Sequence, residues 1–313
     1  MTSDIAVFLG SKTFGLNVLK TLVEASPELH WQVICPNDSN DIRSVADEFK
    51  DFAESNNRIQ SIYFMKPREQ IDSIINKFHV RIGIVCGWYS ILSKDILDIP
   101  QFHFWGIHHS LLPRYRGFSP LVWSIIKGDE FIGSTIFMIT PEMDAGDYVA
   151  QVRIQNDENE SISEIMIRVE EKILSELLTF WEDMKAGKAT LYEQNKSEVT
   201  FVKRRTDADG EIQWNNSATE VHNFIRAQSK PYPGAYFFVN ETEFRVYRSN
   251  VSERYHDIEA GYIIDSCNDI IQISCGNGTV INLPLNSIES GDKTDITQLK
   301  VGSNLILTRK HNN

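Results

Sequence analysis

The sequence predicts an α/β protein in which a parallel sheet with connecting helices precedes a small β-barrel. Short apolar runs alternate with helical patterns through the first two hundred residues, as they do in βαβ units. Short strands with turn signals follow after Thr200, a spacing typical of small barrels. A length of 313 residues is ordinary for two domains, so we expect them at residues 1–200 and 201–313.

The first domain takes its elements from apolar runs and helical spacing. Strands are expected at Ile5–Leu9, Gln32–Cys35, Ile62–Phe64, Ile82–Cys86, Phe104–His108 and Ser134–Ile139, with helices at Asn17–Ala25 and Arg68–Lys77. A long helix is expected over Ser161–Met184, because apolar residues recur there at steps of three or four, and Gly187 follows as a stop signal.

The second domain begins with a charged connector at residues 202–210. A helix is expected at Thr219–Gln228, and strands at Tyr236–Val239, Glu243–Tyr247, Gly261–Asp265, Ile270–Ser274 and Val280–Leu283.

Composition narrows the class of protein. A content of 42% hydrophobic and 24% charged residues predicts a packed core. There is no apolar run of about 18 residues and no signal-peptide pattern, so we expect a cytoplasmic protein without a membrane partner. Cys35, Cys86, Cys267 and Cys275 lack zinc-ligand spacing, so we expect free thiols and no metal. A net charge of −12 argues against a nucleic-acid substrate.

Two polar positions follow apolar strands and are candidates for a common site. His108 ends one strand, and the stiff segment Ser110–Pro113 and the cations of Arg114-Tyr115-Arg116-Gly117 come directly after it. Asp144 follows another strand. Taken alone, either side chain is more often structural. Ligands bind at the carboxyl ends of strands in open α/β sheets, and a carboxylate beside an imidazole orients it. A meeting of His108 and Asp144 across neighbouring strand ends would therefore make a catalytic pair.

These motifs carry a family resemblance. The run His108-x-Ser110-Leu111-Leu112-Pro113-x-Tyr115-Arg116-Gly117, followed by Asp144-Ala145-Gly146-Asp147, resembles the N10-formyltetrahydrofolate-dependent formyltransferases. That family includes methionyl-tRNA formyltransferase, glycinamide ribonucleotide transformylase and sugar N-formyltransferases. Residues 205–214 resemble the RTxxDGxIxW connector, and residues 223–227 and 231–235 resemble the NxIRA and PYPGA segments of the two-domain members. The resemblance implies a Rossmann-like formyltransferase domain followed by an OB-like β-barrel.

The resemblance also implies a catalytic trio of Asn, His and Asp, in which the Asn precedes the His by two residues. His108 and Asp144 match, but the Asn position holds Gly106. In the implied reaction an amine attacks the formyl carbon, His108 stabilises the oxyanion or takes the amine proton, and Asp144 holds the imidazole. Loss of one oxyanion donor costs about 10²–10³ in rate. His109, Ser110 or a water at the Gly106 backbone are the candidate substitutes, and we favour His109 or water.

The remaining site residues follow from the same resemblance. The folate is expected against the end of the fourth strand, at Cys86, Gly87, Trp88, Tyr89, Ile91 and Leu92, together with Asp147. The acceptor substrate is expected at Ser110, Arg116, Gly117, Arg204, Arg205, Arg226 and Tyr232, with Lys203 and Tyr236 as further candidates.

The identity of the acceptor amine is the main question that the resemblance leaves open. The tRNA-specific members carry a basic insertion after the second strand, whereas residues 35–43 are acidic to neutral here. We therefore expect a nucleotide-linked amino sugar. The alternatives are methionyl-tRNA, hydrolysis with release of formate, and a folate or sugar-nucleotide binding protein that has lost turnover with its Asn. A homodimer is left open.

Overall fold

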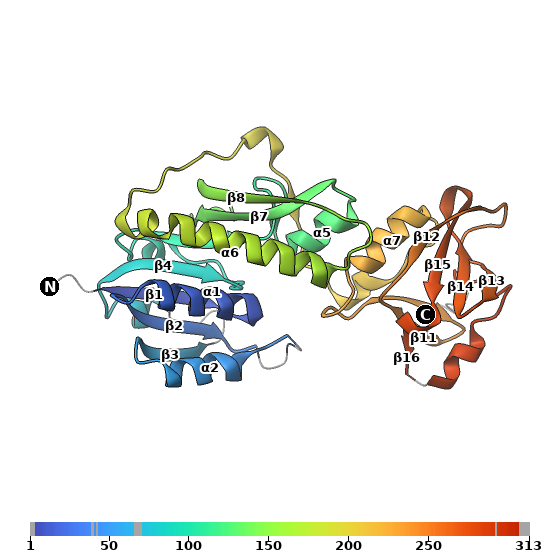
Figure 1. The fold of residues 1–313 in the computed structure, drawn as a ribbon, viewed down its shortest axis with the longest axis horizontal. Coiled ribbons are helices and arrows are strands. Elements are labelled where there is room, and N and C mark those ends of the chain that lie inside the picture. Colours follow the sequence, from blue (N-terminus) through green and yellow to red (C-terminus); the bar gives the residue numbers. More distant parts are fainter. Residues whose placement is uncertain (1–3, 39–40, 42, 66–70, 292, 307–313) are drawn as a thin grey trace. The chain divides into compact units, whose positions relative to one another are not determined.

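The computed structural model describes residues 4–38, 41, 43–65, 71–291 and 293–306 (Figure 1). The chain forms two compact units. The first comprises Met1–Gly117, Gly133–Arg153 and Arg168–Val202, and the second comprises Phe118–Ile132, Ile154–Ile167 and Lys203–Asn313. The division into domains at residues 1–200 and 201–313 stays a prediction, since two earlier segments of the chain also lie in the second unit.

A seven-stranded sheet forms the centre of the first unit, in the order β3-β2-β1-β4-β5-β7-β8. Its strands are β1 (Ile5–Gly10), β2 (His30–Pro36), β3 (Ile59–Met65), β4 (Val80–Cys86), β5 (Phe104–His108), β7 (Phe131–Met138) and β8 (Tyr148–Gln155). The pairs among β1 to β5 are parallel, which confirms the predicted α/β sheet. The strand β7, which overlaps the strand predicted at Ser134–Ile139, runs antiparallel to β5, so the sheet is mixed.

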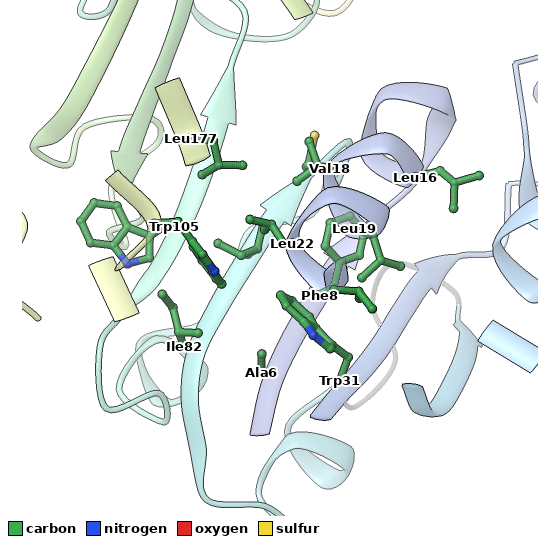
Figure 2. Packing of buried hydrophobic residues seen from close by; sticks show 14 of the residues in the cluster. Ala6, Phe8, Leu16, Val18, Leu19, Leu22, Trp31, Ile82, Trp105 and Leu177 are labelled. Atoms are coloured by element: carbon green, nitrogen blue, oxygen red, sulfur yellow. The ribbon is translucent and has the colours of Figure 1, made fainter. Parts of the chain in front are cut away.

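Helices cover both faces of this sheet. Apolar residues of α1 (Lys12–Ala25), α2 (Ala46–Ser55) and α6 (Ile162–Ala186) pack on the face that carries Ala6, Phe8 and Trp105 (Figure 2). Residues of α3 (Asp72–Ile75) and α4 (Lys94–Leu97) pack on the opposite face, with Phe104. The long helix α6 confirms its periodicity-based prediction. The predicted helix Arg68–Lys77 begins among residues 66–70, which lie outside the described residues, and α3 lies within its remainder.

The second unit contains two antiparallel sheets. One has the order β10 (Ala235–Val239), β11 (Thr242–Val246) and β16 (Ile288–Ser290), and the other has the order β12 (Asn250–Tyr255), β15 (Thr279–Pro284), β14 (Ile270–Ser274) and β13 (Ile263–Cys267). Closure of these strands into a barrel stays a prediction. The unit also holds α5 (Pro120–Ile126) and α7 (Ala218–Arg226). The start of α7 is fixed by a capping box between Ser217 and Glu220.

The smaller elements complete the description. The strands β6 (Arg116–Gly117) and β9 (Phe201–Val202) form a parallel pair in the first unit. Short 3₁₀ helices lie at Lys196–Glu198, Asp207–Gly210, Gly276–Gly278, Leu285–Ser287 and Lys293–Gln298. Within the described ranges, no helix is long and apolar enough to cross a membrane.

Candidate active site

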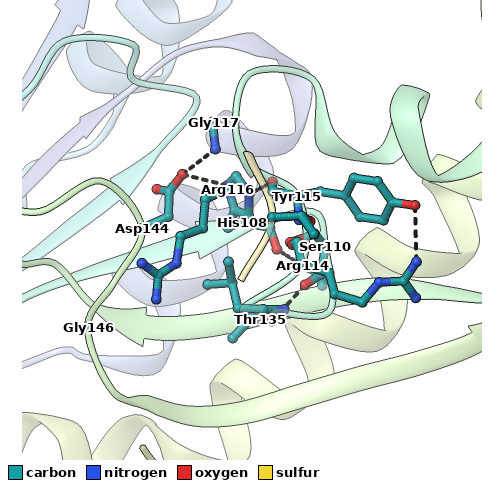
Figure 3. A network of polar contacts seen from close by, with 12 residues as sticks. His108, Ser110, Arg114, Tyr115, Arg116, Gly117, Thr135, Asp144 and Gly146 are labelled. Atoms are coloured by element: carbon teal, nitrogen blue, oxygen red, sulfur yellow. Dashed lines mark hydrogen bonds and ion pairs between the residues drawn. The ribbon is translucent and has the colours of Figure 1, made fainter. Parts of the chain in front are cut away.

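The imidazole of His108 is oriented by a backbone carbonyl. Its Nε2 lies 2.9 Å from the carbonyl oxygen of Tyr115 (Figure 3). Since a carbonyl only accepts, Nε2 must carry a hydrogen, and Nδ1 of the neutral ring is therefore the proton acceptor. Nδ1 faces Oδ2 of Asp144 at 3.8 Å, which is too long for a direct hydrogen bond. The structure thus brings His108 and Asp144 together, and the acceptor nitrogen Nδ1 of His108 faces the Asp144 carboxylate.

The loop that supplies the Tyr115 carbonyl is held by hydrogen bonds of its own. The Ser110 hydroxyl donates to the Arg114 carbonyl, and the Thr135 hydroxyl donates to the Ser110 carbonyl, both at 2.7 Å. Gln151 Nε2 donates to the Leu112 carbonyl at 2.7 Å. These bonds fix the ring of His108 indirectly. They also use the one hydrogen of the Ser110 hydroxyl, so this geometry does not support Ser110 as a replacement oxyanion donor.

Asp144 lies in a tight turn after β7. Its backbone φ is +50°, a left-handed value that L residues seldom adopt. Its Oδ2 accepts a hydrogen bond from the Gly117 N–H at 2.7 Å. Two residues later, a Cβ on Gly146 would lie 1.7 Å from the Met138 carbonyl oxygen, so only glycine fits there. The carboxylate is therefore held by a constrained backbone and by one amide of the neighbouring loop.

The route by which Asp144 reaches His108 differs from the predicted one. The sequence predicts the two residues at neighbouring strand ends of a parallel sheet. In the structure His108 pairs with Thr135, in the middle of β7, whereas Met138 at the end of β7 lies opposite Trp105. Because β7 is antiparallel, the following turn has to return along β5 before Asp144 meets the imidazole.

The Gly106 position is filled by apolar atoms. A Cβ built there would lie 2.7 Å from Cε1 of Phe137 and 3.2 Å from Cγ1 of Ile139. Phe137 is itself buried, and its ring stands edge-on to the ring of His108 at 6.3 Å. The space where an amide side chain would begin is thus occupied by carbon. This packing gives no support to a polar substitute on the side-chain side of Gly106.

His109 lies on the other face of the sheet. Its ring packs on Phe14 of α1 at 5.1 Å, and its Nδ1 lies 3.1 Å from the Ser134 hydroxyl. That hydroxyl donates its hydrogen to the His108 carbonyl at 3.0 Å, so Nδ1 must donate to it and Nε2 is left as an acceptor. Burial, with the neighbouring His108, lowers the pKa of His109 to about 4. The expectation that His109 replaces the Asn is therefore not supported, because its one N–H is already used.

The predicted folate segment begins where β4 meets the turn between β1 and α1. Gly87 has φ +77°, and a Cβ on it would lie 2.5 Å from the Ser11 carbonyl oxygen. The Ser11 hydroxyl donates to the Gly87 carbonyl at 2.7 Å, and the Ser11 N–H donates to the Cys86 carbonyl at 3.1 Å. These contacts fix the backbone at the carboxyl end of β4.

Trp88 and Leu92 of this segment share a face with His108, whereas Cys86 packs on the opposite face with Phe8 and Trp105. Trp88 and Leu92 belong to the apolar cluster that contains Phe104 and Ile139, and His108 follows Phe104 by four residues on the same strand. The buried Nε1 of Trp88 has no hydrogen-bond partner among the residues that the structure describes. Of the other predicted folate contacts, Cys86 is buried, Tyr89 and Ile91 are exposed, and Asp147 is half-buried.

Arg116 is buried behind the Asp144 turn. Its Nη2 and Nε lie 2.7 and 3.2 Å from Oε1 of Gln194, and its Nη1 lies 3.4 Å from Oε1 of the exposed Glu142. A guanidinium engaged in this way does not support the expectation that Arg116 binds the acceptor substrate. The same holds for Gly117, whose N–H is used by Asp144.

Arg226 is likewise engaged within the protein. It donates to the Asn223 and Asn156 side chains at 2.9 and 2.8 Å, and to the carbonyls of Asp157 and Glu160 at 3.0 and 3.1 Å. Burial lowers its pKa to about 10, so it keeps its charge at neutral pH. These contacts tie α7 to residues 156–160 and do not support a role in substrate binding.

The other predicted acceptor contacts differ in exposure. The Arg205 guanidinium lies between the rings of Trp123 and Phe224, 5.2 and 5.3 Å from their centres, and donates to Gln228 at 2.7 Å. It is held in the second unit as a structural cation. The remaining candidates are more open, since Arg204 and Lys203 are exposed and Tyr232 is half-buried, while Tyr236 is buried.

Two residues at the site were missed by the sequence analysis. Gln194 carries no motif and stands fifty positions after Asp144, so only the fold brings it there. Phe137 reads as an ordinary strand residue, and its importance follows only from its pairing with Gly106.

Comparison with known families and relatives agrees with this geometry. The family described as "Formyl transferase" matches residues 5–178, and "Formyl transferase, C-terminal domain" matches residues 204–304. The methionyl-tRNA formyltransferase of Agathobacter rectalis is 31% identical over 280 residues, covering 88% of this chain and 89% of that protein.

Two solved structures share the fold at low sequence identity. A sugar 3N-formyl transferase, determined in the presence of dTDP and 5-N-formyl-THF, has a TM-score of 0.68 and 16% identity, covering 94% of this chain and 99% of that one. An N-formyltransferase from Helicobacter canadensis, in complex with folinic acid and dTDP-3-aminofucose, has a TM-score of 0.67 and 16% identity, covering 91% and 99%.

Both the catalytic and the C-terminal family patterns are therefore present, and the first covers more than half of the chain. The protein belongs to the formyl transferase family, in its two-domain form, and is a formyltransferase.

Proposed function

We propose that this protein transfers the formyl group of N10-formyltetrahydrofolate to the primary amine of a nucleotide-linked amino sugar. The single observation that carries the chemistry is the free Nδ1 of His108, held 3.8 Å from the Asp144 carboxylate. The nucleotide-sugar class of acceptor is supported by the pairing of Lys12 and Arg43 with carboxylates that follow β2.

The reaction uses the His108–Asp144 pair as a base with a charged neighbour. The amine nitrogen attacks the formyl carbon, a new C–N bond forms, and the carbonyl electrons move to the formyl oxygen. The acceptor nitrogen Nδ1 takes the amine proton, and the Asp144 carboxylate stabilises the imidazolium that results. When the tetrahedral intermediate collapses, the C–N bond to the folate breaks and N10 receives a proton. General-base assistance of this kind is worth about 10²–10⁴ in rate.

The end of β4 fits a folate. Fixed backbone at Gly87 allows close approach, and the unpartnered Nε1 of Trp88 offers a donor beside an apolar wall. The related sugar N-formyltransferases were solved with 5-N-formyl-THF or folinic acid. These facts support folate as the formyl donor.

Electrostatics favours a small acceptor. The cation that follows β1, Lys12, is bound by Asp38 and by Asp41, the latter at 2.9 Å, and Arg43 also binds Asp41 at 2.9 Å. Among the described residues, Asp38 and Asp41 after β2 thus pair with Lys12 and Arg43. Since RNA binding gains most of its affinity from cations that contact phosphates, this surface suits a nucleotide sugar better than an acceptor stem.

Methionyl-tRNA is the second candidate, and one observation favours it. The curated relatives with 24–31% identity over most of this chain are methionyl-tRNA formyltransferases. The solved structures with the sugar substrates are more distant in sequence, at 16% identity. Because the family's Asn is absent, the assay must also detect slow turnover and hydrolysis of the formylated folate to formate. A cytoplasmic location and a homodimer stay predictions.

A competition assay separates these functions. The purified protein would be supplied with N10-formyltetrahydrofolate and, in parallel, with a panel of dTDP- and UDP-linked amino sugars and with methionyl-tRNA. The proposal expects kcat/KM for at least one amino sugar to exceed that for methionyl-tRNA, with a weak dependence on salt. A higher kcat/KM for methionyl-tRNA, falling steeply as salt rises, would establish the second candidate. Formate release without an amine would indicate a hydrolase, and folate binding without either reaction would indicate a binding protein.

A further inference from the structure

A buried pair of side chains, Arg116 and Gln194, lies directly behind the Asp144 turn. The Gln194 amide nitrogen donates to the Asp144 carbonyl at 2.8 Å and to the Gly146 carbonyl at 2.7 Å. Its amide oxygen accepts from Nη2 and Nε of Arg116 at 2.7 and 3.2 Å. Both side chains are nearly inaccessible to solvent, at 4% exposed for Arg116 and 7% for Gln194.

The direction of the Gln194 amide is set by its neighbours. A guanidinium has only donors and a carbonyl has only acceptors, so Oε1 must face Arg116 and Nε2 must face the turn. Both amide hydrogens and both oxygen lone pairs are then used. A flip that exchanges the amide oxygen and nitrogen would break all four of these bonds. The Arg116–Gln194 pair therefore has a single hydrogen-bonding arrangement.

The loop that contains Arg116 also contacts the Asp144 turn through its backbone. Gly117, the residue after Arg116, donates its backbone N–H to the Asp144 carboxylate at 2.7 Å. The Arg116 N–H is itself anchored, since it donates to the Thr200 carbonyl at 2.9 Å. Gln194, which Arg116 orients, thus holds the backbone of Asp144, while the backbone of Gly117 holds its carboxylate.

The contacts of Gln194 and Gly117 are needed to hold the Asp144 turn, because the turn has a backbone conformation that an L residue avoids. Asp144 has φ +50°, and no packed helix or strand continues through it. A small change in this backbone would carry the carboxylate away from Nδ1 of His108. The order of the turn therefore determines the geometry of the proposed catalytic pair.

We propose that Gln194, oriented by Arg116, is a positioning residue for formyl transfer, acting only through Asp144. This inference rests on the proposed role of the His108–Asp144 pair. The expected effect is on the rate and not on binding. Loss of the Gln194 donors lowers kcat and leaves the affinity for the folate nearly unchanged.

Two variants test it. Gln194→Met removes all four hydrogen bonds at similar volume. Gln194→Glu keeps the contact with Arg116 but cannot donate to the two carbonyls, so it carries the test if the Met variant does not fold. Misplacement of a catalytic group by about 1 Å can cost about 10²-fold, so we expect kcat to fall about 10- to 100-fold in each, with KM for the folate within about threefold. Glu193→Gln, at the exposed neighbouring position, is the matched control and should leave kcat unchanged.

A double-mutant cycle tests the route. In an Asp144→Asn background, Gln194→Met should lower kcat by less than about twofold further, because both changes disable the same group. An equal fall in both backgrounds, or an unchanged kcat in the folded Gln194 variants, would overturn the proposal.

A measurement without turnover separates this inference from the choice of substrate. Hydrogen exchange of the Gly117 amide, followed by NMR on glycine-labelled protein, should quicken at least tenfold in both Gln194 variants and stay unchanged in Glu193→Gln. Faster exchange with no loss of kcat would refute the catalytic role of the His108–Asp144 pair, while the restraint of the Asp144 turn by Gln194 would stand. Unchanged exchange would refute that restraint by Gln194, whichever acceptor the enzyme uses.

Discussion

Substitution of Gly106 by a larger residue tests whether apolar side chains fill the position where the family has its Asn. Gly106→Ala adds a Cβ that would lie 2.7 and 3.0 Å from Cε1 and Cζ of Phe137 and 3.2 Å from Cγ1 of Ile139. Forcing an extra carbon into a packed core costs about 1–3 kcal/mol. Alanine in a strand is better than glycine by about 0.5–1 kcal/mol. We therefore expect a net loss of about 1 kcal/mol in the free energy of unfolding.

The partner of the clash can be removed separately. Phe137→Leu takes away the two ring atoms that the new Cβ would meet. In that background Gly106→Ala should be neutral or slightly stabilising, a coupling of about 1–2 kcal/mol, within the range that contacting residues show. Gly291→Ala is the control, because Gly291 is exposed and a Cβ there meets nothing within 4 Å.

Urea denaturation at pH 7 measures all five proteins, which are the parent, the two single variants, the double variant and the Gly291→Ala control, with the midpoints compared at constant m value. An equal effect of Gly106→Ala in both backgrounds would refute the reasoning, and so would a stabilising effect in the parent. Either result would mean that the position is open and that a polar group or water can stand where the family has its Asn.

The remaining predictions concern stability and the roles of buried side chains. Burial lowers the pKa of His109 to about 4, below the value of about 6.5 in an unfolded chain. The unfolded state therefore binds more protons, and stability should fall as pH drops from about 6.5 towards 4, by at most about 1.4 kcal/mol per pH unit. His109→Asn should flatten that slope in urea titrations, and an unchanged slope would contradict the assignment. Arg226→Lys keeps the charge but loses the fork that serves four acceptors. It should lower the free energy of unfolding by about 2–4 kcal/mol and leave KM for the acceptor within about threefold. A large rise in KM without loss of stability would return Arg226 to the substrate site.

Much of the fold could be predicted because its signals are local. The strands β1 and β4 are buried on both faces, so they read as nearly continuous apolar runs, and α6 repeats its apolar residues with helical spacing. Strand direction leaves no such trace, which is why the antiparallel pairing of β7 was missed. The strand β8 was also missed, although Val149, Val152 and Ile154 are buried along it.

The site could be predicted in part, for a different reason. His108 and Asp144 were found through motifs, whereas the contacts that orient them come from backbone carbonyls and from Gln194, which no pattern marks. The geometry does not support His109 as a substitute for the Asn, because side chains alternate between the two faces of a strand. Residue 106 and residue 108 face one side of the sheet, and His109 packs on Phe14 on the other.

We propose that His108 performs the proton transfer without an Asn beside it. Formyl transfer by His108→Ala under single-turnover conditions, measured alongside the affinity for the folate, tests this role. We expect a rate at least about 10²-fold below that of the parent, with the dissociation constant of the folate within about threefold. Transfer at the parent rate by the folded variant would contradict it.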